Sequence, residues 1–337
     1  MMSVQVFGQS FPYKFNYLTV DEGLSHTDVN DIVQDGKGYI WIGTNFGLDR
    51  YDGYSIRKFY NNNEPIKNSF KNRIIKIYPD EQDNIWLSTE GGFHRFNPKT
   101  ETFTDFSAGQ GQPSPVFWDF YKPAGDLIYG YLDNSFKIFR IKGSILEEQK
   151  ISLPEGIQIF DMQADKQGIL HFASNTGLWR LDENLEFIQV PVTGLPDLQL
   201  SKVFFDNQNN ILLASGTTVF LANQELSKTN DTPVLAVKKQ YTIPDAESVQ
   251  VISVAKNGDY WINTGDGLTR LDSQLNFIQK IDQQNTPNSL NSNLALSSFI
   301  DRSDCLWIGT SSGGLNYLDL NQKLFYTLKH NSGQLNS

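Results

Sequence analysis

The residues best suited to catalysis or metal binding are four histidines and one cysteine. His26, His94, His171 and His330 show no metal-ligand spacing, and no Ser/His/Asp order or glutamate pair stands out. Cys305 is followed directly by Leu-Trp-Ile, which is typical of an apolar strand, and no histidine motif supports a nucleophilic role for it. The sequence therefore predicts no catalytic residue, no metal site and no cofactor.

Composition narrows the choice of partners. The 337 residues include 28 Lys and Arg against 38 Asp and Glu, a net charge of -10 with a pI near 4.9. An acidic surface repels phosphate backbones, so we expect no nucleic-acid partner. No stretch reaches the roughly 20 apolar residues that a membrane helix needs.

Tryptophan is the residue that recurs with a regular spacing. A short motif is centred on Trp41, Trp86, Trp261 and Trp307, as in YIWIGT and CLWIGT. Three degenerate copies are centred on Ile128, His171 and Leu212, so seven anchors follow one another at intervals of 41 to 49 residues. Repeats of this length are the signature of propeller blades.

Each repeat has features of a four-stranded antiparallel unit. An aspartate stands six residues before five anchors, beside Gly, Asn or Asp, which is turn chemistry. The residue two places after the anchor is small, which lets neighbouring sheets approach closely. We predict an all-β fold, one seven-bladed β-propeller over residues 1–337 with no internal domain boundary. Two terminal segments, 13–19 and 324–329, are each able to supply the strand that closes the ring.

The anchor tryptophans are expected to be structural. Truncating a buried tryptophan to alanine typically costs about 3–5 kcal/mol. We therefore expect substitution of Trp41 or Trp261 by alanine to lower the melting temperature without selectively removing ligand binding.

Residues 23–53, GLSHTDVNDIVQDGKGYIWIGTNFGLDRYDG, resemble the two-component-regulator propeller repeat. This resemblance implies a non-catalytic periplasmic sensor region, the first propeller of a hybrid two-component system in a membrane-anchored histidine kinase. It also implies an oligosaccharide ligand, bound here or by a second propeller, and signalling through a homodimer. Residues 330–337 resemble 285–293, which lead into the seventh repeat, so we expect the chain to stop just before a second propeller.

Two groups of residues are candidates for ligand contact. The first lies in the turns that follow the anchor strands, where propellers often bind ligands: Asn45, Phe46, Glu90, Asp133, Asn134, Asn175, Asp266, Ser311 and Ser312. The second stands ten residues before each anchor, on the expected innermost strand: Asp31, Lys76, Trp118, Asp161, Lys202, Val251 and Ser297. Trp118 in this second group is a candidate for stacking on a sugar ring.

Two other classes of propeller remain as alternatives. An intracellular WD40-like scaffold would repeat Gly-His and Trp-Asp dipeptides from blade to blade, and this pattern is absent, because Gly-His does not occur and Trp-Asp occurs once, at Trp118. A propeller lyase or glycosidase is the second alternative, although a sialidase-type Asp box places Asp five residues before Trp, whereas the interval here is six.

Overall fold

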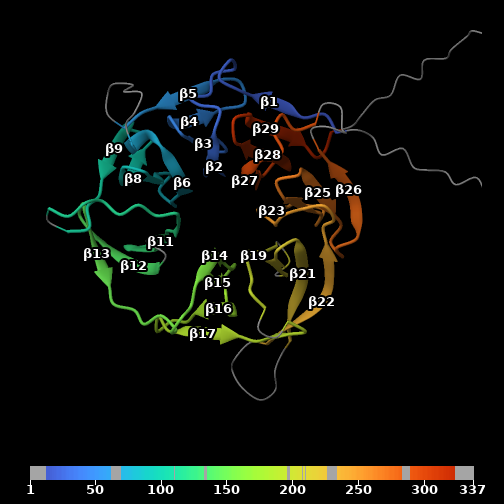
Figure 1. Ribbon diagram of the computed structural model, residues 1–337. Coiled ribbons are helices and arrows are strands. Elements are labelled where there is room, and N and C mark those ends of the chain that lie inside the picture. The colour runs from blue at the N-terminus through green and yellow to red at the C-terminus, as the bar shows by residue number, and fades with distance from the viewer. Residues whose placement is uncertain are drawn as a thin grey trace, which may run out of the picture.

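The chain folds into seven β-sheets arranged as the blades of a ring, as the computed structural model shows (Figure 1). The structure describes residues 13–61, 70–109, 111–132, 135–195, 198–206, 208, 210–225, 234–282 and 289–322. The four main strands of every blade pair with their neighbours in an antiparallel manner. The predicted all-β, seven-bladed propeller is therefore confirmed.

Each blade contributes one strand to each of four concentric positions, from the channel outwards. The inner strands are β2 (Val29–Gln34), β6 (Ile74–Pro79), β10 (Asp119–Tyr121), β14 (Ile159–Ala164), β19 (Lys202–Phe205), β23 (Val251–Val254) and β27 (Ala295–Ile300). The second strands are β3 (Ile40–Thr44), β7 (Ile85–Thr89), β11 (Leu127–Leu132), β15 (Leu170–Ser174), β20 (Ile211–Ser215), β24 (Tyr260–Asn263) and β28 (Cys305–Thr310).

The outer half of each blade follows the same order. The third strands are β4 (Gly47–Tyr51), β8 (Gly92–Asn97), β12 (Ser135–Lys142), β16 (Gly177–Leu181), β21 (Thr218–Glu225), β25 (Leu268–Leu271) and β29 (Gly314–Asp319). The outermost strands are β5 (Ile56–Phe59), β9 (Thr102–Asp105), β13 (Ile145–Gln149), β17 (Phe187–Val190), β22 (Val234–Thr242), β26 (Phe277–Ile281) and β1 (Asn16–Leu18). Blades 1 to 7 are numbered by their inner strands.

Two short elements depart from this plan. Blade 5 has a fifth strand, β18 (Val192–Thr193), which pairs in parallel with the outermost strand β22. A single 3-10 turn, η1 (Phe70–Asn72), leads into β6.

The N-terminal segment closes the ring. Strand β1 pairs with β29 and completes blade 7, so the first strand of the chain lies beside the last one described. Of the two segments considered for closure, the one at residues 13–19 fills this role, and residues 324–329 lie outside the described residues. Phe15, just before β1, is buried in the core between blades 6 and 7.

The repeat anchors lie on the second strands, with one correction. Trp41, Trp86 and Trp261 pair with the arginine nine residues later on the third strand. In blade 3 the same spacing joins Tyr129 to Ile138, whereas Ile128 pairs with Phe139. Tyr129 also packs towards blade 4, as the other anchors pack towards the next blade, whereas Ile128 packs with blade 2. The anchor of blade 3 is therefore Tyr129, one residue after the predicted Ile128.

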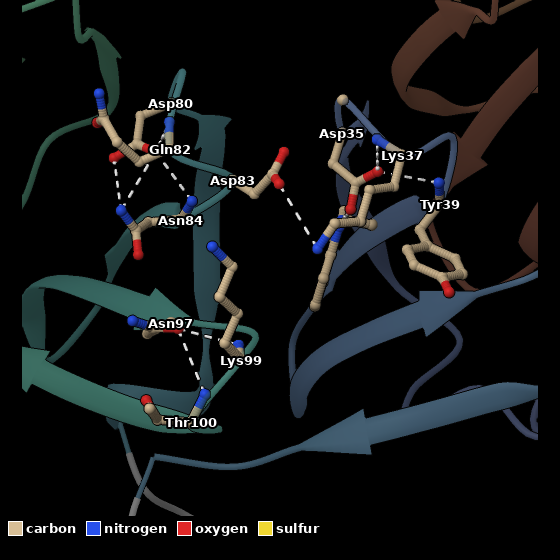
Figure 2. A network of polar contacts seen from close by, with 12 residues as sticks. Asp35, Lys37, Tyr39, Asp80, Gln82, Asp83, Asn84, Asn97, Lys99 and Thr100 are labelled. Carbon is tan, nitrogen blue, oxygen red and sulfur yellow. Dashed lines mark hydrogen bonds and ion pairs between the residues drawn. The ribbon is translucent and has the colours of Figure 1, made fainter.

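Where an aspartate stands six residues before the anchor, it caps its own turn. Asp35 accepts hydrogen bonds from the backbone N–H groups of Lys37 and Tyr39, and its second oxygen accepts one from the Trp41 indole at 2.8 Å. Asp80 and Asp301 make the equivalent bonds to Trp86 and Trp307. In Figure 2 the Asp35 and Asp80 turns lie side by side, joined by the Lys37–Asp83 ion pair at 3.5 Å.

Candidate functional site

A central channel of about 810 Å³ is lined by the inner strands of all seven blades. It contains six of the seven residues that were predicted ten places before the anchors: Asp31, Lys76, Asp161, Lys202, Val251 and Ser297. In blade 3 the channel residue is Asp119 instead of Trp118. This difference follows from the corrected anchor, because Asp119 stands ten residues before Tyr129.

Each of the first five blades contributes a charged side chain to the channel wall at the position ten residues before its anchor, and we call these five residues the charged arc: Asp31, Lys76, Asp119, Asp161 and Lys202. The Lys76 ammonium lies 3.7 Å from a carboxylate oxygen of Asp31 and 3.6 Å from one of Asp119. Lys202 lies 3.2 Å from Asp161. With three carboxylates against two ammonium groups, the arc has a formal charge of -1.

The charged arc also ties neighbouring blades together. Asp31 in blade 1 accepts a hydrogen bond from the Ile77 backbone N–H in blade 2 at 2.9 Å. Asp161 in blade 4 accepts one from the Val203 N–H in blade 5 at 3.0 Å. The carboxylates of Asp31 and Asp119 raise the pKa of Lys76 above its ordinary value, so this lysine stays protonated. Asp31 and Asp161 are thus committed to ion pairs and backbone contacts.

Blades 6 and 7 complete the channel wall without a charge, in a section that we call the open arc: Gln250, Val251, Leu296 and Ser297. Ser297 is 7% exposed, and its hydroxyl oxygen has no hydrogen-bond partner among the described residues. The carbonyl oxygen of the Gln250 side chain is likewise buried without a partner. Among the described residues that line the channel, the side-chain oxygens without a hydrogen-bond partner therefore belong to blades 6 and 7.

The candidate turn residues lie at the end of the ring where the inner strands begin, which we call the entry face. The antiparallel order of each blade brings the turn between its second and third strands to this end. Asn45, Phe46, Glu90, Asn175 and Asp266 lie in these turns. Asp133 and Asn134 lie outside the described residues.

Most of these turn residues are held by neighbouring groups. Asn45 donates a hydrogen bond to the Asp28 carboxylate at 2.9 Å, and Glu90 pairs with Arg73 at 2.9 Å. The Asn175 side chain donates to the Gly156 carbonyl at 3.0 Å. The Phe46 ring lies 5.5 Å from that of Tyr60. Asp266 differs, because one of its carboxylate oxygens is buried with no partner in the described part of the chain.

Exposed apolar side chains gather on the entry face. Trp118, just before β10, is 63% exposed, and Phe160, the second residue of β14, is 42% exposed. β-Bulges at the start of β14 and β27 leave Phe160 and Leu296 unpaired, and a bulge of this kind re-aims a side chain away from the sheet. The other members lie in segments that enter an inner strand: Val20, Phe70 and Leu294. This face therefore offers apolar contact beside a polar channel.

Two other groups with chemical potential are buried away from the channel. His94 lies between Thr89, at 3.0 Å, and Asp105, at 2.8 Å. Thr89 is 1% exposed, and its hydroxyl accepts a hydrogen bond from the Gly91 N–H and donates one to the Gly92 carbonyl. This hydroxyl therefore cannot reach a substrate. Burial raises the pKa of the Cys305 thiol to about 12, so the thiol stays protonated at neutral pH.

Metal and membrane elements were sought in the part of the chain that the structure describes. No three His, Cys, Asp or Glu side chains there lie close enough together to hold a metal ion. No helix among these residues has the length and apolar character needed to cross a bilayer.

Comparison with known proteins identifies the repeat. The fold defines the chain as a seven-bladed β-propeller, and residues 23–46 match the family described as two component regulator propeller. The matched segment spans the start of blade 1, from the loop before β2 to the turn after β3. The resemblance inferred from residues 23–53 is therefore confirmed: blade 1 carries a two-component-regulator propeller repeat.

Similar proteins include a kinase and several propellers. A 63-residue segment is 35% identical to histidine kinase P4 of Formosa agariphila, covering 19% of this chain and 5% of the kinase. The extracellular domain of a putative hybrid two component system from B. thetaiotaomicron superposes with a TM-score of 0.69 at 22% identity, over 91% of this chain and 42% of that domain. Virginiamycin B lyase from Staphylococcus aureus gives a TM-score of 0.67 at 16% identity, over 91% of this chain and 99% of the lyase.

These likenesses carry different weight. At such low identity, the two structural matches show a shared propeller fold and nothing about activity. The chain spans about two fifths of the B. thetaiotaomicron domain and a small fraction of the kinase. What the complete protein senses or transmits is therefore a matter for proposal.

Proposed function

We propose that this chain is a non-catalytic sensor module outside the membrane, in the periplasm, which recognises an oligosaccharide and signals to a histidine kinase. The observation that carries the proposal is the match of residues 23–46 to the two component regulator propeller. The segment similar to histidine kinase P4 supports the same assignment. In the full protein, a second propeller would follow and a homodimer would pass the signal on.

The entry face supplies the chemistry for an oligosaccharide. Sugar rings present apolar C–H faces that pack on aromatic side chains, and hydroxyls that pair with amides and carboxylates. Trp118 exposes its indole there, and it stacks on no other aromatic ring among the described residues. We expect the ligand to change the balance between two states of the sensor, which requires different affinities for those states.

Binding is tested by calorimetry with a panel of oligosaccharides and the Trp118→Ala variant. We expect an oligosaccharide to bind without being cleaved, and Trp118→Ala to weaken the binding about tenfold, equivalent to about 1.4 kcal/mol. Tyr54→Ala is the matched control, because Tyr54 is 98% exposed in the turn between β4 and β5, at the opposite end of the blade. Products with new reducing ends would contradict a non-catalytic role.

The sensor assignment is tested separately by sequencing the gene that encodes the chain. We expect the reading frame to continue into a transmembrane segment and a histidine kinase. A frame that encodes only a soluble propeller would refute the assignment, whatever the chain binds.

A further inference from the structure

Two exposed aromatic side chains on the entry face occupy equivalent places in neighbouring blades. Trp118 stands eleven residues before Tyr129, the anchor of blade 3, and Phe160 stands eleven residues before His171, the anchor of blade 4. The inner strands of these blades, β10 and β14, approach within 8 Å between Cα atoms. The two aromatic side chains therefore lie at the same level of the ring, on either side of the junction between blades 3 and 4.

This position is aromatic in no other blade. The remaining five blades carry non-aromatic residues there: Asn30, Ile75, Ser201, Gln250 and Leu296. Large apolar side chains lose the benefit of burial when they stay in water, so two of them at one junction indicate a surface that binds something.

The charged arc is interrupted at the same junction. Asp31 and Asp161 each accept a hydrogen bond from the backbone of the following blade. Asp119 holds the equivalent position in blade 3, yet it accepts no hydrogen bond from blade 4 in the described part of the chain. Its Oδ1 atom lies 3.6 Å from the Lys76 ammonium in blade 2 and accepts the neighbouring Phe120 N–H at 3.0 Å. Its Oδ2 atom accepts no hydrogen bond from a described residue.

The free oxygen of Asp119 is accessible from the channel. The Asp119 side chain is 30% exposed and lines the channel, whereas the side chain of Asp31 is only 10% exposed. Asp119 also follows Trp118 directly in the chain. A ligand lying on the Trp118 indole is therefore within reach of an accessible carboxylate.

The chemistry of this junction selects a class of ligand. Sugar rings pack their C–H faces on aromatic side chains, and their hydroxyls donate hydrogen bonds to carboxylates. Burial, together with the neighbouring carboxylate of Asp119, raises the pKa of Asp161, so negative charge is already crowded here. The charged arc as a whole has a formal charge of -1, which disfavours an anionic sugar.

We infer that the junction between blades 3 and 4 binds two rings of a neutral oligosaccharide, one on Trp118 and the other on Phe160. Asp119 accepts hydrogen bonds from the sugar hydroxyls at the mouth of the channel. This inference rests on the proposed function, to which it adds an uncharged class of ligand and a second stacked ring.

The ligand class is tested by calorimetry with neutral cello-, xylo-, manno- and galacto-hexasaccharides, and with an oligogalacturonide of the same length. At least one neutral hexasaccharide binds and the oligogalacturonide does not. The monosaccharide that matches the bound hexasaccharide binds at least tenfold more weakly, because it covers one aromatic ring instead of two. Tighter binding of the oligogalacturonide, or equal affinity for the monosaccharide, would overturn the inference.

The location is tested with variants at the junction. Phe160→Ala and Asp119→Asn each weaken binding of the hexasaccharide about tenfold. Phe160→Tyr keeps the aromatic ring and retains the wild-type affinity, which separates stacking from any effect on folding. Phe277→Ala is the matched control, because Phe277 is 53% exposed on β26, the outermost strand of blade 6. An equal loss of affinity in Phe160→Ala and Phe160→Tyr would refute stacking on this residue.

The other outcomes separate the inference from the proposals on which it rests. If Trp118→Ala weakens binding while Phe160→Ala and Asp119→Asn do not, the ligand proposal stands and the two-ring site fails. If no probe binds, the ligand proposal and the inference fail together. If sedimentation shows that replacing both aromatic residues by alanine only dissociates a dimer, the pair is a protein contact and the inference fails. The sensor assignment itself is decided by the gene.

Discussion

At the scale of single residues, a hydrogen bond from the anchor tryptophan to the aspartate six residues earlier recurs in blades 1, 2 and 7. One oxygen of the aspartate carboxylate accepts hydrogen bonds from backbone N–H groups of the turn, and the other accepts one from the buried indole N–H, as in Asp35 and Trp41. Blade 6 lacks this pair, because Ala255 occupies the aspartate position and the Trp261 N–H has no partner in the described chain. Arg270 instead lies over the Trp261 ring at 5.3 Å.

This difference predicts unequal effects of one conservative substitution. Trp41→Phe leaves the buried Asp35 oxygen without its donor, so we expect it to lower the free energy of unfolding by about 1–3 kcal/mol beyond the loss of packing. Trp261→Phe removes an N–H that is already unpartnered and serves as the matched control. Chemical denaturation compares the two, and equal destabilisation would refute the role of the pair.

Asp49 gives the protein a pH-dependent stability. Its carboxylate is fully buried and accepts hydrogen bonds from the backbone and hydroxyl of Ser25, and burial raises its pKa to about 7. Between about pH 4 and pH 7 the folded state keeps a proton that the unfolded state has lost. Stability from this residue therefore falls as pH rises through that window.

The prediction is tested with Asp49→Asn. The variant removes the titrating group and replaces one carboxylate oxygen by an amide nitrogen in a side chain of the same shape. We expect the wild type to lose on the order of 3 kcal/mol more stability than the variant between pH 4.5 and pH 7.5. Parallel pH profiles from chemical denaturation would show that Asp49 titrates normally.

At the scale of elements, the second strands decide how closely blades pack. Gly43, two residues after Trp41, faces blade 2, and a Cβ there would lie 2.7 Å from a methyl carbon of Ile74. Gly309 is equally close to Val29 where blade 7 meets blade 1. The small residues predicted at these positions therefore permit the close approach of neighbouring sheets.

We expect Gly43→Ala to destabilise the protein by overpacking, by about 1–3 kcal/mol. Ile74→Ala removes the Cγ2 methyl that a Cβ on Gly43 would meet, so the double variant should lose less stability than the sum of the two single variants. Thermal denaturation of the single and double variants measures both effects. An additive loss in the double variant would contradict the contact.

How much of this could be predicted from the sequence depended on how local each signal was. The turn aspartates and anchor tryptophans lie within one repeat, so their strands could be recognised directly. Blade 3 has no tryptophan at its anchor, and both Ile128 and Tyr129 fit an alternating strand, so only the pairing register separated them. That error moved the channel residue of this blade from Asp119 to Trp118.

The open arc was the harder case. Gln250 and Ser297 lie at the start of ordinary inner strands, and the lack of partners for their side-chain oxygens depends on contacts made across the fold. One signal was present in the sequence: Thr264 is followed by glycine where Thr44 is followed by Asn45. Aligning the repeats position by position would have shown that blade 6 has Gly265 in place of Asn45, whose side chain accepts a hydrogen bond from Asn30 in blade 1.

At the scale of the whole molecule, blade 7 is joined to blade 1 by side chains as well as by β1. The Arg302 guanidinium donates hydrogen bonds to the carbonyls of Asp35 and Gly36 and to the Gln34 side chain. Lys256 holds the equivalent position in blade 6 and reaches the Arg302 carbonyl at 2.6 Å with one bond.

Arg302 and Lys256 occupy equivalent positions, so substituting each in turn tests how much the side-chain contacts between blades 7 and 1 stabilise the closed ring. Arg302→Met removes three side-chain hydrogen bonds between the first and last blades, so we expect it to lower stability by about 1–2 kcal/mol. Lys256→Met removes one bond between blades 6 and 7 and should have a smaller effect. A larger loss in Lys256→Met, measured by thermal denaturation, would contradict the importance of this seam.

The pairing of β1 with β29 also sets the order of assembly. Asn16 lies opposite Tyr317, so β1 gains its partner only after the third strand of blade 7 has been synthesised. Contacts so distant in sequence slow folding, because the entropy of closing the loop is lost before the contact forms. Until then blade 7 has an unpaired outer edge, which invites pairing with another chain. The ring is therefore most prone to aggregation during the interval between making its last blade and recovering its first strand.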